Sequence, residues 1–401
     1  MKKKIIIYIN QICLRGGVEK VFYTLINNLT PDKYDITILT TVAYISDDLK
    51  IGIYDDTIKR YFFYFDEFSK NFFVRQLQKL YNKIAPFFID RIIKSKKWDI
   101  AIAAQEGMYA EYIAKISAHK KYLWIHNDMH QITTKNFKTK TAEKKCYDSF
   151  DKVICVSEDV KQSMLDIFGT MNNLCVKYNP IDTIEIDLKS KENIAETPAN
   201  HPLFVSIGRL AHQKGFDRLL PIVKKLNDEG YIFEVWIVGE GVERKNLEDY
   251  IKMHNINNVT LLGYRANPFA YIKLADWIIC TSRFEGFNTV LQESIYLQKP
   301  IITTNNAGAH ELLGNNEYGI IMPNTDEDIY KGLKHILDNP NLQNYYSNKA
   351  FERKSFIALK DRIQKIEVIR GFIINHNGPK IVCLYWLLKF RFTNIKIKSL
   401  Y

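Results

Sequence analysis

Short apolar runs alternate with longer segments of helical periodicity along most of this chain. In the first half the runs lie at residues 5–9, 34–39, 98–104, 122–126 and 153–156. In the second half they lie at residues 203–207, 233–238, 259–262, 277–281, 300–304 and 318–321. Runs of this length predict buried strands, and the segments between them carry apolar residues at the spacing of a helix face. Strands that alternate with helices predict parallel sheets.

The alternation stops once, at the polar segment 190–200, which has no core pattern. We therefore predict an α/β fold with two Rossmann-like, doubly wound parallel-sheet domains that face a central cleft. The expected boundaries are a first domain at 1–182, a linker at 183–200, a second domain at 201–345, helices at 346–377 and a basic amphipathic tail at 378–401.

The composition is that of a folded globular protein: of 401 residues, 46% are hydrophobic and 25% are charged. The apolar run after Lys4 is too short for a signal peptide, and no window has the apolar length of a membrane span. The six cysteines lack metal-site spacing, which argues against zinc or a disulfide framework.

The net charge of +11 indicates an acidic partner. Residues 59–97 hold ten basic residues against three acidic ones, mixed with many aromatic residues, and residues 380–401 hold five basic residues and no acidic ones. This composition is typical of contact with an anionic membrane surface. Core packing is the alternative for the aromatic residues of 61–73. Nucleic-acid binding is not expected, because no motif for it is present.

The stretch Ser282–Ser294 carries the main candidate chemistry. It follows the apolar run 277–281 and holds Glu285 and Glu293, with Gly286 after the first. A carboxylate where a strand meets a helix lies in the ligand crevice of a parallel sheet and can accept hydrogen bonds from sugar or ribose hydroxyls. A solvated helix with two ordinary acids is the alternative.

Basic residues and glycines recur at other strand ends. Gly208, Arg209, Lys214 and Gly215 follow the run 203–207, which places backbone N–H groups and two cations near one anion, such as a diphosphate. Three further features are candidates beside a ligand, each with a purely structural alternative: Gly239 with Gly241, Gly16 with Gly17, and His126.

The acids Asp326 and Asp328 have a spacing that suits a divalent metal, but they follow Thr325 at the start of a helix, where such residues cap N–H groups. We therefore expect no metal and no cofactor.

Taken together, these segments resemble glycosyltransferase family 4, the retaining nucleotide-sugar transferases with the GT-B fold. The matching segments stand in the family's order over about residues 1–340: 16–19, 124–127, 156–159, 178–182, 206–209 with 214–215, 238–241 and 285–293. Gln298 and Lys299 depart from the family's usual small residue before Pro300, and the family gives no role for the tail.

The resemblance implies a first domain that binds the acceptor, a second that binds the nucleotide sugar, and a role for each site residue. Arg209 and Lys214 would hold the donor diphosphate, Glu285 the sugar and Glu293 the ribose. The backbone near Gly286 and Phe287 would lie by the phosphates, and His126 by the transferring sugar. The remaining donor-binding positions would be Gly16, Gly17, Gly208, Gly239, Gly241 and Asn288. Because the family favours front-face displacement, neither glutamate is expected to be a nucleophile.

We therefore expect a retaining transferase that moves a hexose or N-acetylhexosamine from a nucleotide-diphosphate sugar, a UDP-sugar, to a lipid-linked glycan acceptor. It would act in bacterial envelope polysaccharide synthesis, in the cytoplasm at the inner membrane face. A sugar-nucleotide epimerase and a non-catalytic nucleotide-sugar-binding subunit are the alternatives. Tyr264 and Arg265 are candidates for contact with the base.

Overall fold

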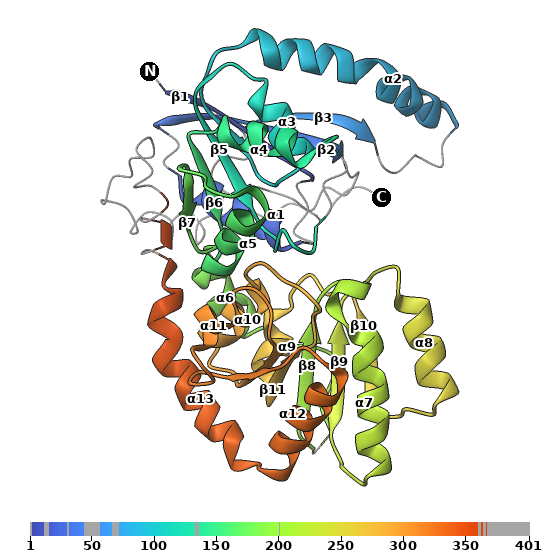
Figure 1. Ribbon diagram of the computed structural model, residues 1–401. Coiled ribbons are helices and arrows are strands. Elements are labelled where there is room, and N and C mark those ends of the chain that lie inside the picture. Colours follow the sequence, from blue (N-terminus) through green and yellow to red (C-terminus); the bar gives the residue numbers. More distant parts are fainter. Residues whose placement is uncertain are drawn as a thin grey trace.

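The chain folds into two α/β domains, one above the other in Figure 1. The computed structural model describes residues 2–11, 16–29, 32–43, 57–65, 72–132, 136–199 and 201–359, with residues 362, 363 and 366. The predicted tail at 378–401 and the last part of the helical segment before it lie outside the described residues, as do Cys13 and Cys383.

The first domain is built on a parallel sheet of seven strands in the order β3-β2-β1-β4-β5-β6-β7. The strands are β1 (Lys3–Ile9), β2 (Tyr34–Ala43), β3 (Lys59–Phe65), β4 (Trp98–Ala103), β5 (Ala118–Ile125), β6 (Lys152–Cys155) and β7 (Leu174–Val176). The helices are α1 (Gly17–Asn27), α2 (Phe72–Ser95), α3 (Met108–Ala114), α4 (Lys140–Asp148), α5 (Glu158–Phe168) and α6 (Thr183–Lys189).

The second domain is built on a parallel sheet of six strands in the order β10-β9-β8-β11-β12-β13. Its strands are β8 (Leu203–Ile207), β9 (Glu234–Val238), β10 (Val259–Gly263), β11 (Trp277–Cys280), β12 (Ile301–Thr304) and β13 (Ile320–Met322). Its helices are α7 (Phe216–Asp228), α8 (Arg244–Met253), α9 (Phe269–Leu274), α10 (Thr289–Tyr296), α11 (Ala309–Leu313), α12 (Asp326–Asp338) and α13 (Asn341–Arg353), with 3₁₀ turns η2 (His212–Lys214) and η3 (Lys354–Ile357).

The predicted fold of two doubly wound parallel sheets is therefore confirmed. All eleven predicted strands are present, and β3 and β7 are two that the pattern did not predict. The segment 183–200 is not irregular throughout, because α6 occupies its first part. Asp182 begins that helix by accepting hydrogen bonds from the N–H groups of Ile184 and Glu185.

The sheet cores follow from strands that are covered on both faces. In β1, residues Ile5–Ile9 are buried, because α1 and its neighbours cover one face of the sheet and further helices the other. A continuous apolar run is what a strand buried on both faces requires.

The two domains contact each other along one side of the cleft. The Tyr178 ring stacks on Phe287 with centroids 4.9 Å apart, and the Ser157 hydroxyl donates to the Gly286 carbonyl oxygen at 2.9 Å. The buried Arg362 donates to the Asn179 carbonyl oxygen at 2.6 Å and to the Gln292 side chain. These contacts bring the loop after β11 against the first domain.

The basic-aromatic stretch divides into two parts. Phe63 in β3 is buried, and the Phe62 ring stacks on Tyr81 of α2, so the alternative of core packing holds for these rings. Phe72, Phe73 and other apolar residues of α2 are instead exposed. No helix within the described ranges has the length and apolarity needed to cross a bilayer.

Candidate functional site

Glu285 lies where β11 gives way to α10, held by polar groups from two loops. Its Oε1 accepts hydrogen bonds from Lys214 Nζ at 2.6 Å and from the Ser282 hydroxyl at 2.6 Å. Asn288 caps α10 by accepting the N–H of Val290 at 2.9 Å, which fixes the start of the helix that carries Glu293. The predicted succession of strand, turn and helix is confirmed.

Lys214 reaches Glu285 from the loop between β8 and α7. Burial is the largest single influence on the pKa of Lys214 and by itself would lower it, but the charge and the hydrogen bond of Glu285, with a contribution from Cys280, together raise the pKa above its ordinary value. Lys214 therefore stays protonated. Arg209 on the same loop is exposed, and its closest recorded hydrogen bond, to Gln213, is 3.5 Å long.

Two glycines let this loop pack closely. Gly215 has a φ of +69°, and a Cβ there would lie 2.1 Å from the Thr281 carbonyl oxygen. A Cβ at Gly208 would meet the Lys214 side chain at 3.0 Å. The glycines thus allow the cationic loop to lie directly on the segment that carries Glu285.

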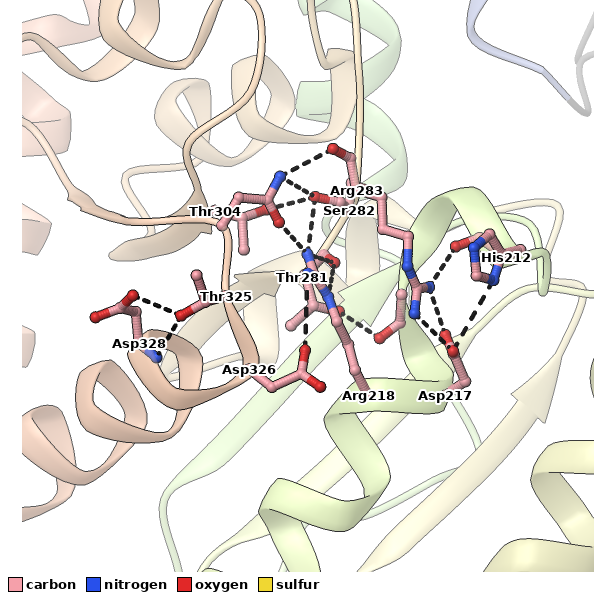
Figure 2. Close-up of polar contacts among 12 residues, drawn as sticks. His212, Asp217, Arg218, Thr281, Ser282, Arg283, Thr304, Thr325, Asp326 and Asp328 are labelled. Carbon is pink, nitrogen blue, oxygen red and sulfur yellow. Dashed lines mark hydrogen bonds and ion pairs between the residues drawn. The ribbon is translucent and has the colours of Figure 1, made fainter. Parts of the chain in front are cut away.

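A buried and a half-buried arginine hold residues 281–283 in place (Figure 2). Arg218 of α7 donates to the carbonyl oxygens of Thr281 and Ser282 at 2.6 Å and 3.1 Å. Arg283 forms two hydrogen bonds of 2.7 Å with the Asp217 carboxylate. Arg218 thus holds the carbonyl groups of residues 281 and 282, and Arg283 ties the next residue to α7, so the two arginines fix the backbone that positions Glu285.

Gly239 and Gly241 contact protein backbone. A Cβ at Gly239 would lie 1.9 Å from the Gly208 carbonyl oxygen, and one at Gly241 would lie 2.3 Å from the Leu210 carbonyl oxygen. Their lack of a side chain is therefore explained by the packing of the β9–α8 loop on the loop that carries Arg209. Their predicted contact with a donor remains a prediction.

The first domain contributes Gly16, Gly17 and Lys20 from the start of α1. A Cβ at Gly17 would lie 3.5 Å from the Thr289 hydroxyl of α10, so this loop faces the second domain. Lys20 Nζ donates to Glu293 Oε1 at 3.0 Å, which forms an ion pair between the domains.

Glu293 is almost fully buried. Burial raises the pKa of its carboxyl, and the charge of Lys20 opposes that rise. The second oxygen, Oε2, has no hydrogen-bond partner among the described residues. Glu293 is also one of the residues that line a crevice, together with Lys20, Thr24, Glu185, Phe269 and Thr289.

His126 follows β5 on the opposite wall. Burial lowers the pKa of His126 to about 3, so the ring is neutral. The ring is hydrogen-bonded to the backbone of Ala104, and its Nε2 has no partner within the part of the chain that the structure describes. A Cβ at Gly286 would lie 1.9 Å from the His126 carbonyl oxygen, so the two predicted site residues meet across the domain boundary.

Other predicted residues lie apart from this centre. The Phe287 side chain packs on Tyr178 between the domains. Arg265 pairs with Glu196 of the linker, and Tyr264 is 44% exposed. Asp328 donates its N–H to the Thr325 hydroxyl at 3.2 Å, so the predicted capping arrangement is present. Among the residues described, no group of His, Cys, Asp and Glu side chains has metal-ligand geometry.

Two family profiles match the chain in succession. Residues 15–185 match Glycosyltransferase Family 4, and residues 189–353 match Glycosyl transferases group 1. Together they account for both domains, and the two sheets have the GT-B arrangement. The chain is a glycosyltransferase of the GT-B, family 4 type.

Relatives of this glycosyltransferase are found in both sequence and structure. A Campylobacter jejuni N-acetylgalactosamine-N,N'-diacetylbacillosaminyl-diphospho-undecaprenol 4-alpha-N-acetylgalactosaminyltransferase is 31% identical over 56% of this chain, and the match spans only 61% of that enzyme's length. The amylovoran biosynthesis glycosyltransferase of Erwinia amylovora is 23% identical over 88% of this chain and 95% of its own. The crystal structure of Anabaena HepE in complex with UDP superposes with a TM-score of 0.65 at 16% identity, covering 91% and 98% of the two chains.

Sequence reasoning missed several residues of this glycosyltransferase that hold the site together. Lys20, Arg218 and Glu106 had no motif to mark them. Glu106 is buried and accepts hydrogen bonds from the His126 N–H at 3.2 Å and from the Asn127 side chain at 2.7 Å. An acid two residues after the apolar run 98–104, at the end of a predicted buried strand, was the available signal.

Proposed function

We propose that this glycosyltransferase transfers a hexose or N-acetylhexosamine from a UDP-sugar to a glycan acceptor with retention of anomeric configuration. One observation carries the proposal: Lys214 is bonded to Glu285 on the second domain, and the residues directly after Glu285 meet the first domain, Gly286 at His126 and Thr289 at Gly17. Two cations, a carboxylate and a neutral imidazole are the groups that a diphosphate-activated sugar needs.

The two cations act on the leaving group. As the bond between the sugar C1 and the diphosphate oxygen breaks, negative charge develops on the diphosphate. Arg209 and protonated Lys214 stabilise this charge, and N–H groups at the start of α7 add to the field. The proposal needs no metal for this step.

The two glutamates position the donor. Glu285 accepts hydrogen bonds from sugar hydroxyls while Lys214 and Ser282 hold its Oε1. Glu293 accepts from the ribose through Oε2 while Lys20 stays on Oε1. Neither carboxylate acts as a nucleophile. The acceptor oxygen bonds to C1 on the face that the diphosphate leaves, and the acceptor proton passes to the departing diphosphate oxygen.

The proposed acceptor is a glycan on a polyprenyl diphosphate, in bacterial envelope polysaccharide synthesis at the inner membrane face. The Campylobacter relative is named for an acceptor on diphospho-undecaprenol, and the Erwinia relative for amylovoran biosynthesis. The net charge of +11 suits an anionic diphosphate lipid.

The first experiment identifies the donor. UDP-, GDP- and dTDP-sugars are compared for the rise in melting temperature that each causes, because a ligand that binds only the native state raises it. We expect UDP-sugars to give the largest rise. A larger rise with GDP- or dTDP-sugars would overturn the choice of base.

The second experiment tests the site by measuring transfer to a glycan diphosphate lipid. Lys214→Gln is expected to lower kcat/KM by about 100-fold or more, as loss of charge stabilisation does in other enzymes. Glu293→Gln is expected to lower kcat/KM because it alters the proposed ribose acceptor. Lys245→Gln, on the exposed surface of α8, is the matched control. Unchanged turnover in Lys214→Gln would refute the site, and an epimerised sugar formed from donor alone would identify an epimerase instead.

A further inference from the structure

Helix α2 turns its apolar side away from the protein. Leu77, Leu80, Ile84, Phe87 and Phe88 are 66%, 52%, 42%, 66% and 56% exposed. On the side that faces the domain, Gln78 is buried together with Ile89 and Ile93. A surface helix of a globular protein normally has the opposite arrangement.

The exposed residues form one stripe. The apolar positions 73, 77, 80, 84 and 87 are spaced alternately by four and three residues, which places them on one side of a helix. We call this the α2 stripe. An exposed apolar surface of this extent, over a helix of 24 residues, marks an interaction site.

The charges around the α2 stripe are almost all positive. The helix contains Arg75, Lys79, Lys83, Arg91 and Lys94, all of them exposed. Its single acid, Asp90, pairs with Lys94 at 2.9 Å. Lys79 and Lys83 adjoin the stripe, so the same surface offers apolar side chains and cations together.

This charge pattern decides between two occupants. The spacing of the stripe also suits a helix pair, but a second copy of α2 would bring an equally basic surface against this one, without the acidic partners that stabilise such pairs. An anionic lipid surface is complementary to both the apolar stripe and the cations that flank it.

We infer that α2 lies in the plane of an anionic membrane surface, with the α2 stripe at the boundary of headgroups and acyl chains. This inference rests on the proposed lipid-linked acceptor only for its biological purpose. Figure 1 shows α2 on the side of the first domain remote from the second, which leaves the second domain clear of the membrane. The helix begins after the carboxyl end of β3, the edge of the parallel sheet at which Gly16 and His126 also lie.

The test uses sedimentation of the full chain with vesicles of phosphatidylglycerol and phosphatidylcholine, or of phosphatidylcholine alone. We expect binding to the anionic vesicles that weakens as salt is raised. The triple variant Leu77→Gln, Leu80→Gln, Ile84→Gln should lose about tenfold or more in affinity. Its control, Ile232→Gln, Val242→Gln, Met253→Gln, removes three exposed apolar residues from the second domain and should bind normally.

A second pair of variants tests the charges. Lys79→Gln with Lys83→Gln should lose about fivefold in affinity for each charge, whereas Lys245→Gln with Lys252→Gln on α8 should change little. Glutamine keeps the helix propensity, so all variants should retain native circular dichroism. An equal loss of vesicle affinity in the test and control variants would overturn the inference, as would a failure of the unaltered chain to bind the anionic vesicles.

Two further measurements separate the outcomes. A dimer in light scattering that the α2 variants dissolve would show that a second copy covers the stripe, and would overturn the lipid assignment. Transfer to a short acceptor glycan without lipid should be unaltered in the α2 variants. If the α2 variants lose vesicle binding but still transfer sugar to that glycan, α2 serves membrane binding and not the reaction. If no nucleotide sugar reacts with the unaltered chain, the proposed function fails, but the inference about α2 does not.

Discussion

Glu293 is expected to lower the stability of the fold while serving the site. Its Oε2 is buried without a partner among the described residues, and such an acceptor costs about 1–3 kcal/mol. The ion pair with Lys20, which is 29% exposed, stabilises the fold by about 1 kcal/mol. Glu293→Gln removes both the buried charge and the pair. We therefore expect its free energy of unfolding to equal that of the unaltered chain or to exceed it by up to about 2 kcal/mol.

The raised pKa of Glu293 determines how the stability difference between the unaltered chain and Glu293→Gln changes with pH. Because burial raises the pKa of the Glu293 carboxyl above 4.5, the folded state holds this proton more tightly than the unfolded state. The unaltered chain is therefore most stable, with respect to this group, below its unfolded pKa, and loses that stability as the pH rises through the raised pKa. Glu293→Gln has no such proton. The difference between the two proteins should be smallest near pH 4.5 and widen toward neutral pH.

Urea unfolding of both proteins at several pH values measures this difference, with Glu248→Gln on the exposed surface of α8 as the control. Glu293→Gln should also show no rise in melting temperature with a UDP-sugar, because the proposed ribose acceptor is altered. A difference that narrows as pH rises, or a variant less stable than the unaltered chain at neutral pH, would refute the reasoning. A retained response to the UDP-sugar would refute the ribose role alone.

Three other substitutions test the site. Lys214→Met leaves the buried Glu285 carboxylate without its cation, which should cost about 3–5 kcal/mol in unfolding free energy; equal urea midpoints would contradict this. Gly286→Ala places a methyl carbon 1.9 Å from the His126 carbonyl oxygen, and should cost about 1–3 kcal/mol and at least about tenfold in transfer rate; a fully active variant would show that the contact is dispensable. His126→Gln should reduce the loss of stability on acidification between pH 6.5 and about pH 3, because in that range the native ring stays neutral while the ring of the unfolded chain takes up a proton, which favours unfolding. Parallel curves for that variant and the unaltered chain would contradict it.

The fold could be predicted because its signals are local. The apolar runs that became β1, β8, β9, β11 and β12 are bounded by glycines and polar turns, and each is buried on both faces. The convergence of Lys214 and Glu285 could also be expected, because both follow neighbouring strands of one parallel sheet, β8 and β11. The carboxyl ends of such strands meet at the same edge.

The contacts that brace the site could not be predicted, because they join residues far apart in the sequence. Lys20 and Glu293 are 273 residues apart, and Arg218 and Ser282 are 64 apart. No periodicity links such pairs. The residues Lys59–Phe65 were ambiguous for another reason: aromatic residues favour strands, but mixed with cations they also suit a membrane surface. Only the three-dimensional structure separates the packed rings of β3 from the exposed ones of α2.

Buried acceptors without partners indicate the chemistry of the expected ligand. Native proteins satisfy most buried polar atoms, and each exception calls for an explanation. Glu293 Oε2 on one domain and His126 Nε2 on the other are two such atoms, and the neutral ring of His126, bonded to the backbone of Ala104, leaves Nε2 as an acceptor. A ligand that completes both must bring an O–H group to each domain. Sugars and ribose supply such groups, whereas a phosphate supplies acceptors, and in the proposed site it would be met instead by Arg209 and Lys214. The division of acceptors and cations between these positions therefore matches a nucleotide sugar better than it matches a free sugar or a free nucleotide.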